Sequence, residues 1–294
     1  PFTTSATIFQ GSGKKYVTWG VGDADWLYNM FIENIEFVRY AKKNGLKVLA
    51  DIYENPYIFR ELIDEIDAHP EFEPISYEKK SQEAQAVLRE KYVDELLLLA
   101  DQYLIPSQYV ADCLRRSPNF DENKVNIIPY VSSIKNDTYD NNPIKGRIIW
   151  IGNDPVRKGL IYATHAIRNL KKKYPFLELR VIGPMPIDIV ESDSFSDVKF
   201  LGYLNKEQLT SEFKQADIYI FPTLAEGFAG SLLEAASFGV PIITTKASGF
   251  GDDFPGFFVE ERNTKEIESA IITLIEDRVL RDKMSYDFFE YSQK

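Results

Sequence analysis

Two glutamates, Glu226 and Glu234, are separated by seven residues in the segment FPTLAEGFAGSLLEAASFGVP (221–241). Glu226 precedes a turn of small residues, and Glu234 lies in a short helical run that Gly239 and Pro241 close. The first turn of a helix presents free N–H groups and the positive end of the helix dipole, which suit a phosphate. A carboxylate repels phosphate but accepts hydrogen bonds from the hydroxyls of a sugar or ribose. The pattern therefore predicts a nucleotide-sugar site.

A structural explanation of the same residues stays open on this segment alone. The order Ser231-Leu232-Leu233-Glu234 fits a capping box, in which the glutamate only folds back onto the start of its own helix. Glu226 would then be a solvated loop acid.

A basic pair, Arg157 and Lys158, stands upstream in RIIWIGNDPVRKGL (147–160). It follows an apolar run of strand length and precedes a helical pattern. Guanidinium and ammonium groups are suitable counter-charges for a diphosphate. A lone basic pair more commonly faces solvent, but its place at a strand end and the downstream Glu226 segment favour phosphate binding here.

The elements that position these residues alternate between strands and helices. Strands are expected at 147–151, 177–182, 198–201, 217–221 and 241–245. Helices are expected at 158–173, at 205–216 with Asn205 as N-cap, and in a final stretch capped by Thr264. Such alternation predicts a doubly wound parallel sheet, whose ligands lie at the carboxyl ends of the strands. Residues 153–158, Gly183 and Glu226 all follow strand ends and should converge.

The preceding part of the chain predicts a first α/β domain less clearly. A strand is expected at 47–52, with helices near 26–44, 56–66, 81–100 and 107–116. The polar stretch 132–142 (SSIKNDTYDNN) is rich in turn-forming residues and predicts a link between domains. We therefore divide the chain into domains 1–138 and 139–294.

Composition excludes several classes of protein. The 294 residues are 44% hydrophobic and 27% charged, which is ordinary for a globular protein, and the net charge of −11 argues against nucleic acid as a partner. No apolar run reaches membrane-spanning length. The single cysteine, Cys113, excludes an intramolecular disulfide and should be a buried apolar residue. We expect a cytoplasmic protein and leave peripheral membrane contact open.

The motif EGFAGSLLEA followed by GVPII resembles the donor-binding motif of the retaining GT-B glycosyltransferases of the GT4 type (glycosyltransferases group 1). Further segments match that family in order: RIIWIGNDPVRKGL, LRVIGP, VKFLGYL and ADIYIFPT, and upstream LADQYLIPSQYVADCL and KVNIIPY. The resemblance covers about residues 90–280.

This resemblance implies the GT-B fold, an α/β architecture of two Rossmann-like domains, the first on the acceptor side and incomplete here. It implies retaining, metal-independent transfer from a UDP-, GDP- or ADP-sugar to a saccharide or lipid-linked acceptor, without a cofactor. Arg157 and Lys158 would stabilise the leaving diphosphate, Glu226 would hold the donor sugar, and Glu234 the ribose. The expected donor-binding residues are Gly152, Asn153, Gly183, Tyr203, Gly227, Phe228, Ala229, Gly230, Ser231 and Glu234.

Two departures from the family pattern bear on activity. The family often has Gly-Arg after its first strand, where this chain has Gly152-Asn153. The family's H-E-x-P pattern on the acceptor side is replaced by Tyr53-Glu54-Asn55-Pro56, and tyrosine is a poorer base than histidine at neutral pH. His69 and His165 should be structural or solvated.

Other motifs carry little weight. Asp23-Ala24-Asp25 matches the metal-binding D-x-D of GT-A enzymes, but the rest of the pattern is not GT-A. Gly11-Ser12-Gly13-Lys14 is too short for a P-loop. The sequence contains no His/Cys cluster for zinc.

The ends of the sequence lack the family's opening strand and its closing helix, so we expect a fragment or shortened form whose activity is slow. A non-catalytic nucleotide-sugar-binding protein or a GT-B-fold epimerase stay open as alternatives. A phosphorylase would need a lysine-bound cofactor, for which no motif is present.

Overall fold

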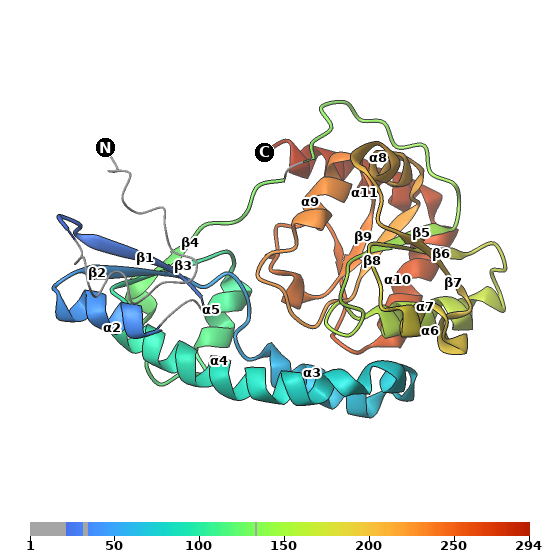
Figure 1. Ribbon diagram of the computed structural model, residues 1–294. Coiled ribbons are helices and arrows are strands. Elements are labelled where there is room, and N and C mark those ends of the chain that lie inside the picture. Colours follow the sequence, from blue (N-terminus) through green and yellow to red (C-terminus); the bar gives the residue numbers. More distant parts are fainter. Residues whose placement is uncertain (1–21, 32–34, 133) are drawn as a thin grey trace.

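The computed structural model describes residues 22–31, 35–132 and 134–294, which form two parallel sheets with flanking helices (Figure 1). The first sheet has four strands in the order β1-β2-β3-β4, and the second has six in the order β10-β9-β8-β5-β6-β7. All strand pairs are parallel. The predicted α/β class with two Rossmann-like units is confirmed.

In the first unit all connections advance across the sheet in one direction. Right-handed crossovers therefore place helices α2, α4 and α5 on one face of the sheet (Figure 1). The elements are β1 (Trp26–Met30), α2 (Ile35–Lys43), β2 (Lys47–Asp51), α3 (Ile58–Ala68), η2 (Pro70–Glu78), α4 (Lys79–Leu99), β3 (Gln102–Ile105), α5 (Gln108–Leu114), η3 (Glu122–Lys124) and β4 (Val125–Ile127).

In the second unit the strand order reverses between β5 and β8, so helices lie on both faces of the sheet. Helix α6 packs on α10, and α9 packs on α11. The elements are β5 (Arg147–Ile151), α6 (Leu160–Lys171), β6 (Glu178–Ile182), α7 (Ile187–Val190), η4 (Asp193–Phe195), β7 (Val198–Gly202), α8 (Lys206–Gln215), β8 (Ile218–Phe221), α9 (Gly230–Ser237), β9 (Ile242–Thr244), η5 (Lys246–Ser248), β10 (Phe257–Phe258), α10 (Thr264–Glu276) and α11 (Arg278–Ser292).

The predicted strands of the second unit are confirmed to within one or two residues, and Asn205 caps α8 through a reciprocal pair with Gln208. Two expectations were wrong. Residues 26–30 form strand β1, because the aromatic segment WLYNM suits a strand and pairs with β2. Asn263, rather than Thr264, caps the final stretch, whose helix is interrupted at Asp277.

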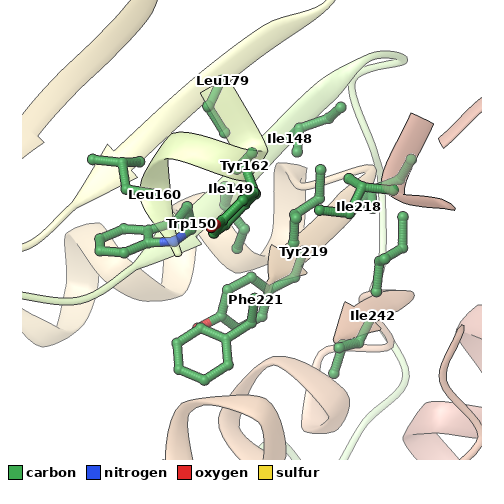
Figure 2. Packing of buried hydrophobic residues seen from close by; sticks show 14 of the residues in the cluster. Ile148, Ile149, Trp150, Leu160, Tyr162, Leu179, Ile218, Tyr219, Phe221 and Ile242 are labelled. Carbon is green, nitrogen blue, oxygen red and sulfur yellow. The ribbon is translucent and has the colours of Figure 1, made fainter. Parts of the chain in front are cut away.

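The core of the second unit includes side chains from strands β5, β6, β8 and β9 and from helix α6 (Figure 2). The strand residues Ile148, Ile149, Trp150, Ile218 and Tyr219 are all fully buried. Fully buried strands of continuous apolar sequence are typical of a sheet that is covered on both faces.

Helix α3 and the following turn η2 do not pack with the first sheet's core. Their buried side chains, Ile58, Leu62, Ile66, Phe72 and Ile75, belong to the hydrophobic cluster of the second unit. Phe72 stacks on Phe195 at 6.4 Å between ring centroids. In Figure 1 this arm runs along the underside of the second unit. Residues early in the chain therefore help to position the second unit beside the first.

Candidate functional site

The candidate site lies where the strand order of the second sheet reverses. Strands β5 and β8 are neighbours, yet the chain leaves them toward opposite sides of the sheet. The loop after β5 carries Arg157 and Lys158, and the loop after β8 carries Glu226. Such a switch point opens a crevice beyond the carboxyl ends of the strands, where open α/β sheets bind ligands.

The three charged residues contact one another in this crevice. Arg157 Nη1 lies 2.7 Å from Glu226 Oε1, and Lys158 Nζ lies 2.8 Å from the same oxygen. Arg157 Nε also lies 3.3 Å from Asp154 Oδ2. The side chains of Arg157, Lys158 and Glu226 are only 22%, 14% and 13% exposed, so water screens these pairs weakly.

Burial and the neighbouring carboxylates have opposite effects on the pKa values of Arg157 and Lys158. Burial lowers the pKa of the Lys158 ammonium, and the neighbouring Glu226 offsets this only in part. For Arg157 burial also acts to lower the pKa, but Glu226 and Asp154 outweigh it and the pKa is raised. Arg157 therefore remains charged, and an anion beside Lys158 favours the charged form of its ammonium against the effect of burial.

Close backbone approaches explain two of the glycines in the predicted set. Gly183 has a φ of 119°, and a Cβ there would lie 2.0 Å from Gly152 O, so the ends of β5 and β6 meet without side chains. A Cβ on Gly227 would lie 1.7 Å from Tyr53 O in the first unit. Gly227 thus lets the Glu226 loop touch the first unit.

Helix α5 and its N-cap residue in the first unit also contact the Glu226 loop. Ser107 Oγ donates a hydrogen bond to Gly227 O at 2.6 Å, and the Tyr109 hydroxyl donates to Leu224 O at 3.2 Å. Ser107 is also the N-cap of α5, since its side chain accepts from Val110 N–H. Neither contact was predicted from the sequence, because no local pattern marks partners that are 120 and 115 positions away.

The start of helix α9 has neither a Ser231 capping box nor a full set of free N–H groups. The N-cap is Ala229, which makes no side-chain cap hydrogen bond, and the Ser231 hydroxyl lies 2.9 Å from the Tyr219 hydroxyl. The capping-box alternative, with Ser231 as cap, is therefore wrong.

Two of the amides that the sequence predicted to be free are engaged. Ala229 N–H donates to Ser248 O and Gly230 N–H to Phe228 O, both at 3.0 Å. A Cβ built on Gly230 meets no atom of the described residues within 4 Å, so this helix start faces open space. Glu234 lies half-buried one turn further along α9.

One predicted donor-binding residue, Tyr203, lies apart from this cluster. Tyr203 follows β7, which is separated from β5 by β6, and its side chain is 82% exposed. The structure therefore does not bring Tyr203 to the Arg157–Glu226 pair. Asn153 is exposed on the loop after β5.

The first unit completes the site with residues that follow its own strand ends. A cavity of about 170 Å³ lies between Glu226, Phe228 and the segment after β2, lined by Tyr53, Glu54, Asn55, Ile58, Tyr130, Arg157, Ala225, Glu226, Gly227 and Phe228. Burial raises the pKa of Tyr130 to about 12, so its hydroxyl keeps its proton. The sequence motifs suggested a role for Tyr53 but none for Asn55 or Tyr130, although both follow strand ends.

The metal-binding and P-loop motifs that the sequence analysis set aside, and Cys113, are not part of this site. Asp23 and Asp25 precede β1, at the opposite end of the first sheet from Tyr53. The segment 11–14 lies outside the described residues. Cys113 is buried, and burial raises the pKa of its thiol to about 11. No helix within the described part of the chain has the length and apolar character needed to cross a membrane.

The two histidines lie at the junction between α3, η2 and α6. His69 Nε2 lies 2.9 Å from the Tyr162 hydroxyl, and His165 Nε2 lies 2.8 Å from Glu71 Oε1. Neither residue lines the cavity beside Glu226. Both bridge the two units, as expected of structural residues.

Comparison with known proteins confirms the resemblance predicted from the motifs. Residues 145–277 match the family model described as Glycosyl transferases group 1. The D-inositol 3-phosphate glycosyltransferase of Corynebacterium kroppenstedtii is 26% identical over 164 residues, which cover 50% of this chain and 36% of that protein. The chain spans 22% to 50% of the length of the first curated relatives that it matches.

Solved structures confirm the GT-B fold. The crystal structure of TarM has a TM-score of 0.69 at 15% identity, covering 95% of this chain and 53% of TarM. The pneumococcal O-GlcNAc transferase GtfA, solved in complex with UDP and GlcNAc, has a TM-score of 0.62 at 14% identity, covering 91% of this chain and 53% of GtfA.

Proposed function

We propose that this protein is a glycosyltransferase that moves a hexose from a nucleoside-diphosphate sugar to an acceptor hydroxyl with retention of anomeric configuration. One observation carries the proposal: Arg157, Lys158 and Glu226 meet at the switch point between β5 and β8, beside a cavity that the first unit closes. Cations that neutralise a diphosphate and a carboxylate that accepts from hydroxyls are thus within one ligand's length of each other.

The ion pairs suggest how donor binding would rearrange the site. Glu226 Oε1 is shared by Arg157 and Lys158. The phosphates of a donor would compete for both cations, because each phosphate brings several anionic oxygens. The Glu226 carboxylate would then be released to accept hydrogen bonds from the donor sugar. Binding would thereby couple recognition of the phosphates to that of the sugar.

Catalysis would consist mainly of stabilising the departing diphosphate. As the bond to the anomeric carbon lengthens, negative charge grows on the leaving phosphate oxygen, next to Arg157, Lys158 and the start of α9. Glu226 would lie near the developing positive charge of the sugar. We assign no enzymic nucleophile. Because two cations already face the phosphates, we propose that transfer needs no divalent metal.

The donor base remains a choice among uridine, guanosine and adenosine, and Glu234 is proposed to hold the ribose. The test is calorimetric titration of UDP, GDP and ADP, followed by product analysis with the sugar nucleotide of the base that binds. Binding of one nucleoside diphosphate with transfer or slow hydrolysis of its sugar nucleotide is the expected result. Absence of binding by all three would overturn the proposal.

A second candidate is a nucleotide-sugar-binding protein that does not catalyse transfer. Tyr53, which stands where the family has histidine, favours it, since a tyrosine is a weak base at neutral pH. Binding of a sugar nucleotide without any turnover, with or without acceptors, would identify this second function.

A further inference from the structure

The loops that carry Arg157 and Glu226 are anchored by different parts of the protein. The backbone of Arg157 is held within the second unit. Its carbonyl oxygen accepts from Leu224 N–H at 2.8 Å and from Thr223 Oγ1 at 3.1 Å, and its N–H donates to Asp154 Oδ1 at 2.9 Å. These three partners all lie in the loops after β5 and β8, so the phosphate-binding cation keeps its place without the first unit.

Glu226 stands between two carbonyl groups that the first unit holds. Before it, Leu224 O accepts from the Tyr109 hydroxyl at 3.2 Å, and after it, Gly227 O accepts from Ser107 Oγ at 2.6 Å. Tyr109 lies on helix α5, and Ser107 is the N-cap of that helix. A single helix end of the first unit therefore fixes the loop on both sides of the glutamate.

The Tyr109 hydroxyl is itself fixed by a chain of hydrogen bonds. Asn55 Nδ2 donates to it at 3.2 Å, and Asn55 Oδ1 accepts from Tyr57 N–H at 3.0 Å, which sets the orientation of the amide. Burial raises the pKa of Tyr109, so its hydroxyl keeps the proton that it donates to Leu224 O. The Tyr109 ring packs against the hydrophobic clusters of both units.

Donor binding would make the position of Glu226 depend more strongly on these bonds. In the free protein Arg157 and Lys158 hold the carboxylate directly, and Arg157 Nη1 also donates to Ala225 O at 2.9 Å. In the proposed function the donor phosphates compete for both cations. The glutamate then relies on the backbone of its own loop for its position, and a functional side chain stays in place only when such supporting contacts hold it.

We propose that Tyr109 and Ser107 are positioning residues that make recognition of the donor sugar, but not of the phosphates, depend on the contact between the two units. This inference rests on the proposed glycosyltransferase function and specifies how its donor site is regulated. Contact with α5 holds the loop where Glu226 reaches the sugar, whereas Arg157 stays anchored in the second unit. Loosening of the contact would release the sugar and leave the nucleoside diphosphate bound.

The test is calorimetric titration with two kinds of ligand, the nucleoside diphosphate that binds and its glucose, mannose and N-acetylglucosamine derivatives. Tyr109→Phe removes one hydroxyl, and Ser107→Gly removes the other while glycine remains a tolerated N-cap. The matched control is Tyr103→Phe, because Tyr103 is also buried and its hydroxyl donates to Leu97 O within the first unit. Thermal unfolding should show similar losses of stability in the two tyrosine variants, since each leaves buried partners unsatisfied.

We expect Tyr109→Phe and Ser107→Gly to bind the sugar nucleotide about tenfold more weakly than wild type and the nucleoside diphosphate equally well. Tyr103→Phe should bind both ligands as wild type does. In a Glu226→Ala background, Tyr109→Phe should weaken sugar-nucleotide binding no further, because it acts through the glutamate that is already absent. A purely structural role of Tyr109 would instead weaken both ligands in either background.

Equal losses for the two ligands, full additivity with Glu226→Ala, the same losses in Tyr103→Phe, or no binding of any sugar nucleotide would overturn this inference while leaving nucleoside diphosphate binding intact. Failure of every nucleoside diphosphate to bind would remove the proposed function and this inference with it.

Discussion

Lys158 Nζ lies 2.8 Å from Glu226 Oε1, although 68 positions separate the two residues in the chain. Arg157 contacts the same oxygen at 2.7 Å. The residues proposed to bind the phosphates and the sugar therefore neutralise each other while no donor is bound. Variants of either partner should change the free and the bound protein differently.

Glu226→Ala should lower transfer without weakening nucleoside diphosphate binding. The substitution removes the anion that competes with phosphate for Arg157 and Lys158, so affinity for the diphosphate should stay the same or rise. Loss of charge-assisted hydrogen bonds to the sugar should reduce kcat/KM by about 10- to 100-fold, corresponding to about 1.5–3 kcal/mol. Steady-state kinetics and calorimetry test this, and a fall in diphosphate affinity equal to the fall in kcat/KM would contradict it.

Replacing both Arg157 and Lys158 by alanine should weaken nucleoside diphosphate binding far more than nucleoside binding. Only the diphosphate brings anionic oxygens to these side chains. Lys172→Ala, an exposed cation at the end of α6, is the matched control and should leave both affinities unchanged. Equal losses for the two ligands would mean that the basic pair acts on folding.

Nucleoside diphosphate binding should take up protons at alkaline pH. Burial lowers the pKa of Lys158, so this amine loses its proton at a lower pH than an ordinary lysine. A bound diphosphate favours the charged form and raises that pKa, so affinity should fall as pH rises through the depressed pKa of the free protein. Calorimetry in buffers of different ionisation enthalpy measures the uptake. Lys158→Arg should abolish it, because arginine stays protonated.

Gly227→Ala and Gly230→Ala should differ sharply in their effect on stability. The first has no room for a methyl group, since its Cβ would lie 1.7 Å from Tyr53 O, so the two units must separate or the loop must move. We expect a lower Tm and little transfer. The second faces open space and should keep its stability within about 1 kcal/mol of wild type. If Gly230→Ala nevertheless loses diphosphate affinity, a phosphate approaches the backbone at the start of α9.

Glu234→Gln should weaken binding of the nucleoside itself. If Glu234 accepts hydrogen bonds from both ribose hydroxyls, loss of its charge should cost about 1.5–3 kcal/mol for nucleoside and nucleoside diphosphate alike. Because Ala229 rather than Ser231 caps α9, the thermal stability of the variant should change little. Calorimetric titration with both ligands decides, and unchanged affinities would exclude the ribose role.

The sequence by itself determined the second unit and the positions of its charged residues. Strand runs such as 147–151 are continuous apolar segments bounded by glycine, and the alternation with helices specifies a parallel sheet. The rule that ligands lie at carboxyl strand ends also predicted that Arg157 and Lys158 would lie near Glu226, which both contact. These signals are local, or depend only on topology, and can be read along the chain.

Tertiary structure alone decided which groups oppose one another across the two units. The contact of Gly227 with Tyr53, the bond from Ser107 to Gly227 O and the packing of Phe72 on Phe195 join segments that no local pattern connects. Whether Glu226 faces solvent, a helix or two cations likewise depends on the paths of distant loops. Pairing and packing over such separations arise from the mutual fit of many side chains, so they follow from the folded whole and not from any one segment.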